Sequence, residues 1–227
     1  MYDGTLPRDM KTAIGYSYYN DLESIKRGIP TFINEVDYVF AIDGRFSLRE
    51  GPDYSDDGST EYLSGFPNVL FRKFVGMEHD KRQQYIEMAK EHNISVLIIL
   101  DTDEYIVEAD WPLFKSNLEK LLDNPQNIHG LECYYNSTDT TPYPRVWIRP
   151  QEISYYHAHC IFNVNGQIMR SPSAIKSVKG VKMRMDDTLR DEEYLKKTSE
   201  YQGRMIEYEK PIRKHAWDLH LDKILDS

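Results

Sequence analysis

Short apolar runs alternate with amphipathic segments along the first half of the chain. The apolar runs predict strands, and they cover residues 11–18, 37–42, 69–74 and 94–100. The amphipathic segments between them predict helices over residues 22–35, with an interruption at Pro30, and over residues 79–93. This order is typical of an α/β fold with a mostly parallel central sheet flanked by helices.

The second half has a different pattern, because strand-like segments follow one another directly. After a helix that begins near Asp110 or Trp111 and ends near Leu122, strands are predicted over residues 130–135, 145–148, 155–164 and 167–170. Asn165-Gly166 joins the last two strands and strongly indicates a hairpin. Residues 47–65 are expected to be a loop with a binding task, and Thr188–Glu209 a long helix. We therefore expect a smaller antiparallel C-terminal part, within one domain whose halves are residues 1–107 and 108–227.

The most informative stretch is the apolar run Ile94–Leu100, because it ends directly in the acidic residues Asp101, Asp103 and Glu104. Open α/β sheets bind their ligands beyond the carboxyl ends of the strands. If strand alternation continues past Leu100, Asp101 and Asp103 lie on the same side. A hard cation such as Mg²⁺ or Mn²⁺ would then relieve their repulsion. The alternative is that these acidic residues form a solvated turn.

The charge and composition of the chain argue against several classes of protein. The 227-residue chain has a formal net charge of −9, which disfavours broad nucleic-acid binding. No apolar run is long enough for a transmembrane segment, and no signal peptide is expected at the N-terminus. Cys133 and Cys160 are expected to be reduced core residues rather than a disulfide or a zinc site. We therefore expect a cytoplasmic protein.

Three features in sequence order resemble the glycosyltransferases of the GT-A fold, and most closely the family-2-like enzymes. They are a second strand that ends at Asp43-Gly44, the basic pair Lys81-Arg82 at the start of a helix, and a strand that ends as Leu100-Asp101-Thr102-Asp103-Glu104. The resemblance covers residues 10–110. It implies a metal-dependent, hexosyltransferase-type enzyme that moves a sugar from a nucleotide-diphosphate donor, a UDP- or GDP-sugar, to an acceptor hydroxyl by inversion. The acceptor could be a glycan, a lipid or a protein.

The resemblance also assigns a donor site. It matches Tyr16 and Tyr18 to the base, Asp43 to the nucleoside, Lys81 and Arg82 to the phosphates, and Asp101 and Asp103 to Mg²⁺ or Mn²⁺. Such an ion would stabilise the leaving diphosphate, and a helix N-terminus with basic residues would add to that effect. The chain departs from the family at Arg45-Phe46, where family members usually have Ser-Thr, so its contacts on the ribose side are expected to differ.

An inverting transfer also needs a general base near the acceptor hydroxyl. The candidates are Asp187 and Asp186, just before the last expected helix, and Glu132 on a strand, and we favour Asp187. An acidic residue at a helix start can also simply interact with the helix dipole. His157 and His159 share a strand face and could bind a metal, although such a pair is more commonly a packing pair. Core packing is expected for Trp111, Trp147 and Trp217.

Two other functions stay open. A phosphatase with an aspartate nucleophile also carries an Asp-x-Asp motif, but usually on its first strand and followed by small residues rather than by Glu104-Tyr105. A catalytically degenerate protein of the same fold would bind a nucleotide or glycan without turnover, and the altered segment at Arg45-Phe46 favours it. A sugar nucleotidyltransferase is disfavoured, because Tyr16–Asn20 contains no glycine-rich phosphate loop.

Overall fold

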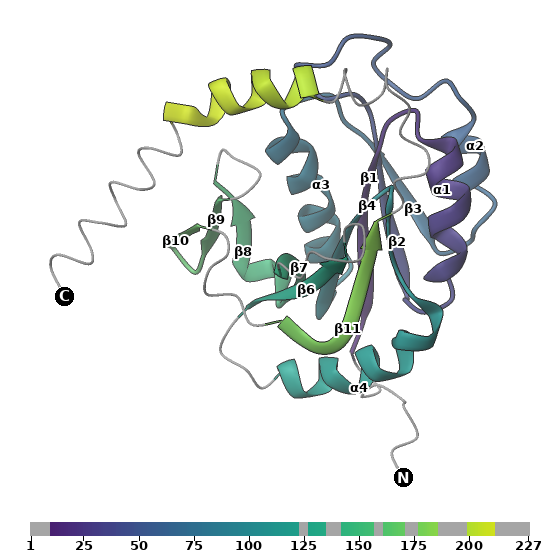
Figure 1. The fold of residues 1–227 in the computed structure, drawn as a ribbon, viewed down its shortest axis with the longest axis vertical. Helices are drawn as coiled ribbons and strands as arrows, with labels where there is room; N and C mark the ends of the chain where they lie inside the picture. Colours follow the sequence, from purple (N-terminus) through teal and green to yellow (C-terminus); the bar gives the residue numbers. More distant parts are fainter. Residues whose placement is uncertain are drawn as a thin grey trace, which may run out of the picture.

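The structure is a computed structural model that describes residues 10–122, 127–134, 142–156, 161–170, 177–185 and 199–211. Its centre is a twisted sheet with helices on both faces (Figure 1). Parallel strands form one side of this sheet, in the order β3-β2-β1-β4. They are β1 (Thr12–Tyr18), β2 (Tyr38–Asp43), β3 (Val69–Lys73) and β4 (Val96–Asp101), and all lie where the apolar runs predicted them.

The other side of the sheet is mixed. β7 is antiparallel to both β4 and β6, whereas β6 is parallel to β11, which is antiparallel to β5. These strands are β5 (Glu104–Ile106), β6 (Ile128–Tyr134), β7 (Pro142–Ile148) and β11 (Ser177–Met185). A second, antiparallel sheet consists of β8 (Ile153–Tyr155), β9 (Ile161–Val164) and β10 (Gln167–Arg170). The predicted fold class is confirmed: a mostly parallel central sheet, flanked by helices, with a smaller antiparallel part.

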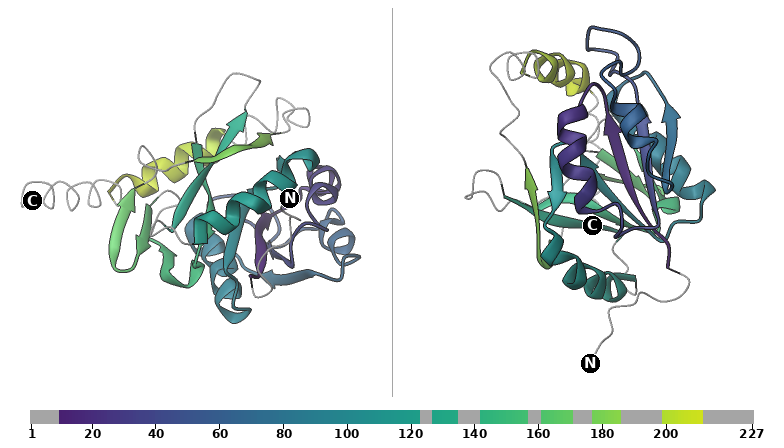
Figure 2. Two further views of the ribbon diagram at one scale, coloured as in Figure 1. Left: turned by 90° about the horizontal axis from the view of Figure 1, so that it is seen from below. Right: turned by 90° about the vertical axis from the view of Figure 1, so that its right-hand side faces the viewer.

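Helices cover both faces of the central sheet (Figures 1 and 2). On one face Ile25, Leu63 and Phe114, from three helices, join a single hydrophobic cluster with the strands. On the other face Tyr85 and Ile86 belong to a second cluster, which also includes residues of β8 and β9. The helices are α1 (Leu22–Gly28), η1 (Ile29–Thr31), α2 (Ser59–Leu63), α3 (Glu78–Glu91), η2 (Glu108–Asp110), α4 (Trp111–Leu122), η3 (Pro150–Glu152) and a further helix over residues 199–211. None of the helices in the described ranges is long and apolar enough to cross a membrane.

The predicted interruption at Pro30 is confirmed. The helix that was expected over residues 22–35 ends at Gly28, and the chain continues as the short 3₁₀ helix η1. Proline cannot donate the backbone hydrogen bond that would continue an α-helix, so Pro30 is accommodated at the start of the shorter element.

The prediction of a loop over residues 47–65 was wrong in part, because α2 lies within it. The carboxylate of Asp57 accepts hydrogen bonds from the backbone N–H of Leu22 at 2.9 Å and of Ser59 at 3.0 Å. One side chain therefore accepts the first backbone N–H of both α1 and α2, which have no partner within their helices. This contact holds the segment after β2 against the start of α1.

The hairpin between β9 and β10 is confirmed, since Asn165 and Gly166 both have positive φ angles, of 50° and 82°. β5 and β11 were not predicted, and the strand predicted over residues 155–164 overlaps β8 only at Tyr155. Of the long helix expected over Thr188–Glu209, residues 188–198 lie outside the described part of the chain. The helix described there covers residues 199–211.

The strand order places a candidate binding edge at one end of the sheet. β2 and β3 follow β1 to one side, whereas β4 lies on its other side, so the direction of the strand order reverses between β1 and β4. Ligands of open α/β sheets bind at such a switch point, beyond the carboxyl ends of the strands. Ser17 near the end of β1 and Asp101 at the end of β4 are register partners there.

Candidate functional site

Two predicted site carboxylates lie at this edge but on opposite faces of the sheet. Side chains alternate along a strand. Asp101 therefore shares a face with Leu97 and Ile99, which pack in the cluster that contains α3. Asp43 shares a face with Val39 and Ala41, which pack in the cluster that contains α1. The acidic motif at the end of β4 consequently faces α3, whose first turns carry Lys81 and Arg82.

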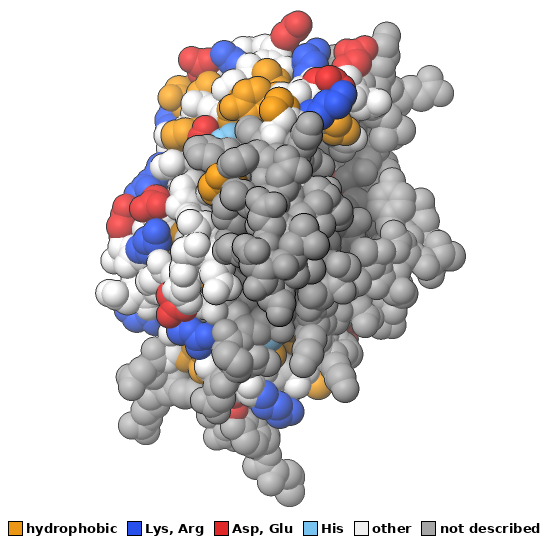
Figure 3. Space-filling view, turned by 90° about the vertical axis from the view of Figure 1, so that its left-hand side faces the viewer, with side chains coloured by type: hydrophobic (Ala, Val, Ile, Leu, Met, Phe, Trp, Pro, Cys, Tyr) orange, Lys and Arg blue, Asp and Glu red, His pale blue; other side chains and the backbone are white. Residues whose placement is uncertain are grey.

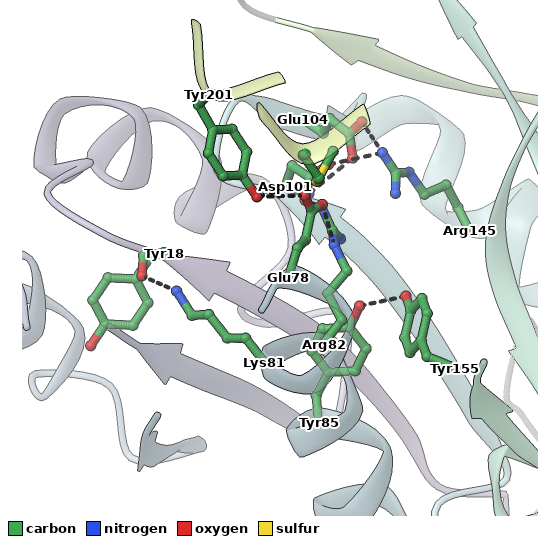
Figure 4. A network of polar contacts seen from close by, with 11 residues as sticks. Tyr18, Glu78, Lys81, Arg82, Tyr85, Asp101, Glu104, Arg145, Tyr155 and Tyr201 are labelled. Carbon is green, nitrogen blue, oxygen red and sulfur yellow. Dashed lines mark hydrogen bonds and ion pairs between the residues drawn. The ribbon is translucent and has the colours of Figure 1, made fainter. Parts of the chain in front are cut away.

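Asp101 lies at the centre of a partly buried polar network (Figure 4). Its two carboxylate oxygens accept hydrogen bonds from Arg82 at 2.7 Å and from Arg145 at 3.0 Å. Arg145 also donates to Glu104, and Glu104 in turn accepts the backbone N–H of Asp101 at 2.9 Å. Burial opposes ionisation of Asp101, but the guanidinium groups of Arg82 and Arg145 hold its pKa well below the usual range. Burial raises the pKa of Glu104.

The strand ends earlier than the metal hypothesis assumed. β4 stops at Asp101, and the next two residues form a turn before β5 begins at Glu104. Strand alternation therefore does not place Asp101 and Asp103 on the same side. The carboxylate that contacts Asp101 is that of Glu104, which accepts its backbone N–H. Asp103 is partly exposed in the turn.

Asp101 does not fit the role of a metal ligand in this arrangement. Both of its oxygens accept hydrogen bonds from guanidinium groups, and their positive charges would repel a divalent cation. Within the described ranges, no group of three or more His, Cys, Asp or Glu side chains could hold a metal ion. Two guanidinium groups thus supply the positive charge next to Asp101.

The network extends from Arg82 to the helix over residues 199–211. Arg82 donates through Nε to Glu78 at 2.9 Å, and the hydroxyl of Tyr201 donates to the other oxygen of Glu78 at 3.0 Å. Beside it, the hydroxyls of Tyr85 and Tyr155 are 2.9 Å apart and join α3 to β8. Residues far apart in the sequence are therefore connected by a continuous chain of polar contacts (Figure 4).

Sequence reasoning missed Glu78, Arg145 and Tyr201 as members of this network. Arg145 had a usable signal, because it begins the otherwise apolar segment Arg145-Val-Trp-Ile. Glu78 lies just before the predicted start of α3, and Tyr201 was one of many tyrosines. Their roles depend on long-range packing, which the local pattern does not reveal.

Lys81 does not lie in this network, although it was matched to the donor phosphates. It is buried, and its amine donates to the carbonyl oxygen of Tyr18 at 2.6 Å and to that of Gly44. It thus joins the carboxyl ends of β1 and β2. Burial lowers the pKa of Lys81 to about 7, although Asp21 and Asp43 favour its charged form.

The residues matched to the nucleoside are also buried. The hydroxyl of Tyr16 donates to the carbonyl oxygen of Thr102 at 3.3 Å, and the hydroxyl of Tyr18 is 2.8 Å from that of Thr60. Asp43 accepts hydrogen bonds from the backbone and hydroxyl of Ser55 at 3.1 and 2.7 Å. In this conformation these polar groups hold the carboxyl edge of the sheet and the following loop together.

The remaining predicted residues are partly outside the described chain. Asp186, Asp187, His157, His159, Cys160 and Trp217 lie outside the described residues, and the side chains of Glu132 and Cys133 are not described either. Trp111 and Trp147 are buried in the core, as expected.

Comparisons with known proteins do not identify the family of this chain. No protein-family model matches the chain, and no curated protein matches it. Among solved structures, the chain is similar to S. aureus TarS in complex with UDP-GlcNAc, with 12% identity over 59% of this chain and 37% of that one and a TM-score of 0.45. It is similar to TarS in complex with UDP, with 14% identity over 59% and 38% of the two chains and a TM-score of 0.43. For another TarS structure the identity is 11% over 65% and 30%, with a TM-score of 0.47. The chain spans well under half the length of these three structures, and the similarity assigns it neither a family nor a function.

Proposed function

We propose that this chain is a glycosyltransferase of the GT-A type, which moves a sugar from a UDP- or GDP-sugar to an acceptor hydroxyl by inversion. The observation that supports this most is the pair of largely buried arginines, Arg82 and Arg145, at the carboxyl end of β4 beside the switch point. Sugar transfer leaves negative charge on the departing diphosphate, which fixed guanidinium groups stabilise. A guanidinium has five N–H donors, so it can hold a carboxylate and a phosphate at once.

The proposal includes a divalent cation, but with a different set of ligands from the one that the sequence predicted. Since Asp101 is held by two arginines, we assign Mg²⁺ or Mn²⁺ to Asp103 together with the phosphates of the donor. When bound, the ion would act as a Lewis acid on the leaving diphosphate. Asp187 keeps its assignment as the general base, with Asp186 as its alternative.

The test is turnover of nucleotide sugars. Wild-type protein with Mn²⁺ is incubated with a panel of UDP- and GDP-hexoses, with and without simple glycoside and lipid acceptors, and the released nucleoside diphosphate is measured. We expect one donor to be hydrolysed slowly and to be used faster with an acceptor. Asp103→Asn should lose most of this activity, whereas the matched variant Asp110→Asn, outside the motif, should keep it. Failure of the wild-type protein to bind or turn over any donor would contradict the proposal.

A second candidate function is binding of a nucleotide or glycan without turnover. It is favoured by the Arg45-Phe46 segment, where the sequence departs from the family-2 pattern. Calorimetry of UDP and GDP separates the two functions, since binding with no hydrolysis across the panel supports the second. An aspartate-nucleophile phosphatase has less support, because both oxygens of Asp101 accept hydrogen bonds from arginines.

A further inference from the structure

An aromatic stack lies at the same edge of the sheet, next to the arginine network. The ring of Tyr201 stacks on the ring of Phe46, with centroids 5.4 Å apart and an interplanar angle of 16°. The guanidinium of Arg49 lies 5.0 Å from the Tyr201 ring centroid and 5.5 Å from that of Phe46. Phe46 belongs to the Arg45-Phe46 segment, where the sequence departs from the family-2 pattern.

Phe46 is held firmly in place by its own loop. Its backbone forms a bridge with Gly76, and the next residue, Ser47, donates to the carbonyl oxygen of Gly76 at 2.8 Å. Arg45 spans the loop, because its guanidinium donates to the carbonyl oxygen of Arg49 at 3.1 Å and to Asp53. The amine of Lys81 lies 5.1 Å from the Phe46 ring centroid. These contacts make the ring a fixed platform, and Arg45 contributes to its rigidity.

Tyr201, in contrast, belongs to a helix that packs on this edge through a narrow stripe. Within the helix over residues 199–211, Tyr201, Met205 and Glu209 are buried at a spacing of four residues, whereas Ile206 and Tyr208 are exposed. Figure 3 faces the side of the molecule that carries this helix and shows hydrophobic side chains among charged ones at its upper end. Beyond the stack, the hydroxyl of Tyr201 contacts Glu78 at 3.0 Å and the sulfur of Met205 at 3.3 Å.

Stacking on a fixed aromatic ring with a cation beside it is also how proteins hold a nucleobase. Tyr16 and Tyr18 cannot provide such a surface in this structure, since their side chains are buried. Phe46 lies three residues beyond Asp43, the last residue of β2, and is close to both Arg49 and Lys81. Its ring is therefore placed to stack with the base of a nucleotide whose phosphates reach the arginine network.

We propose that Phe46 is the stacking platform for the nucleobase, and that Tyr201 occupies this position until a nucleotide displaces it. The inference rests on the proposed use of a nucleoside-diphosphate donor. Arg49 then contributes a cation beside the base, and the helix over residues 199–211 moves away from Phe46 when the nucleotide binds. The Tyr201 ring and the base compete for the surface of Phe46. Removal of the Phe46 ring should therefore weaken nucleotide binding, whereas removal of the Tyr201 ring should strengthen it.

Calorimetry with UDP, GDP and inorganic pyrophosphate tests this competition. Phe46→Leu should weaken the binding of UDP and GDP at least about fivefold, because a stacked base is lost. Binding of pyrophosphate, which has no base, should stay unchanged. Tyr201→Leu should strengthen the binding of UDP several-fold, while the matched variant Tyr208→Leu, which changes an exposed tyrosine of the same helix, should bind like the wild type. Phe46→Trp keeps an aromatic surface and should bind UDP at least as well as the wild type.

The outcomes separate this inference from the proposed function. If the wild-type protein binds UDP and a folded Phe46→Leu variant binds it with equal affinity, the role of Phe46 as a stacking platform is refuted, whereas the proposed function is not. Equal losses of UDP and pyrophosphate binding in Phe46→Leu, or weaker UDP binding in Tyr201→Leu, overturn it as well. If Phe46→Leu fails to fold, weaker UDP binding by Phe46→Trp overturns the platform, and binding that is equal or tighter supports it. Wild-type protein that binds neither UDP nor GDP refutes the proposed function, and the platform with it.

Discussion

Arg82 connects two acidic residues that come from different elements. Its side chain, with an exposed fraction of 11%, contacts Glu78 one turn away on α3 and Asp101 at the end of β4. The exposed fraction of Glu78 is 9%, so neither Arg82 nor Glu78 is well solvated. Such a pair is a weak source of net stability, but loss of Arg82 would leave the poorly solvated carboxylate of Glu78 with the Tyr201 hydroxyl in place of an ion pair.

Arg82→Ala should therefore lower the free energy of unfolding by about 3 kcal/mol, which urea denaturation measures. Arg72→Ala is the matched control, because Arg72 also pairs with a glutamate, Glu91, but with exposed fractions of 29% and 54%. That pair should contribute less than about 1 kcal/mol. Equal losses of stability in the two variants would mean that the ion pairs of Arg82 contribute no more than a surface ion pair does.

The position of α3 depends on the absence of a side chain at Gly15 in β1. A Cβ atom at Gly15 would lie 2.7 Å from Cγ of Tyr85, a distance that requires the helix or the ring to shift. Since α3 carries Glu78 and Arg82, the same close approach brings these residues to the end of β4.

Gly15→Ala should reduce stability by about 1–3 kcal/mol, because an added methyl group overpacks this contact. In the helix over residues 199–211, Gly203 has nothing within 4 Å of the position of its Cβ. Gly203→Ala should consequently be neutral or stabilising by up to about 1 kcal/mol. Thermal denaturation of both variants checks this, and an unchanged melting temperature in Gly15→Ala would show that α3 adjusts without cost.

The sequence predicted most of the regular elements and two of the residues that meet at the carboxyl end of β4. β1 to β4 are short apolar runs and α4 has a clear amphipathic pattern, and the acidic motif was correctly placed at the carboxyl end of β4. β5 is too short to show a period, and the turn at Thr102-Asp103 has no clear signal. Arg82 and Asp101 were both predicted as site residues, but their direct contact depends on how α3 packs on the sheet.

At the scale of the whole molecule, Lys81 makes stability depend on pH. Burial lowers its pKa from 10.5 to about 7 in the folded protein, whereas the unfolded chain keeps the higher value. Between these two values the unfolded state binds a proton that the folded state does not bind. The free energy of unfolding should therefore rise with pH above 7, by at most about 1.4 kcal/mol per pH unit.

Denaturation at pH 7, 8 and 9 measures this slope, and Lys81→Met should flatten it. The experiment stays below pH 9.5, because burial raises the pKa of Tyr16, Tyr85 and Tyr155, and their ionisation in the unfolded chain would reverse the trend at higher pH. A slope of the same size in Lys81→Met would assign the pH dependence to other groups.

The placement of Asp43 and Asp101 on opposite faces of the sheet limits the shape of any molecule that contacts both. Such a molecule has to pass over the end of β1, which lies between β2 and β4. Its two ends then meet different surroundings: hydroxyl groups of Ser55 and Thr60 near Asp43, and guanidinium groups near Asp101. A ligand that reached both surroundings would therefore need two different ends, one neutral and polar and one anionic.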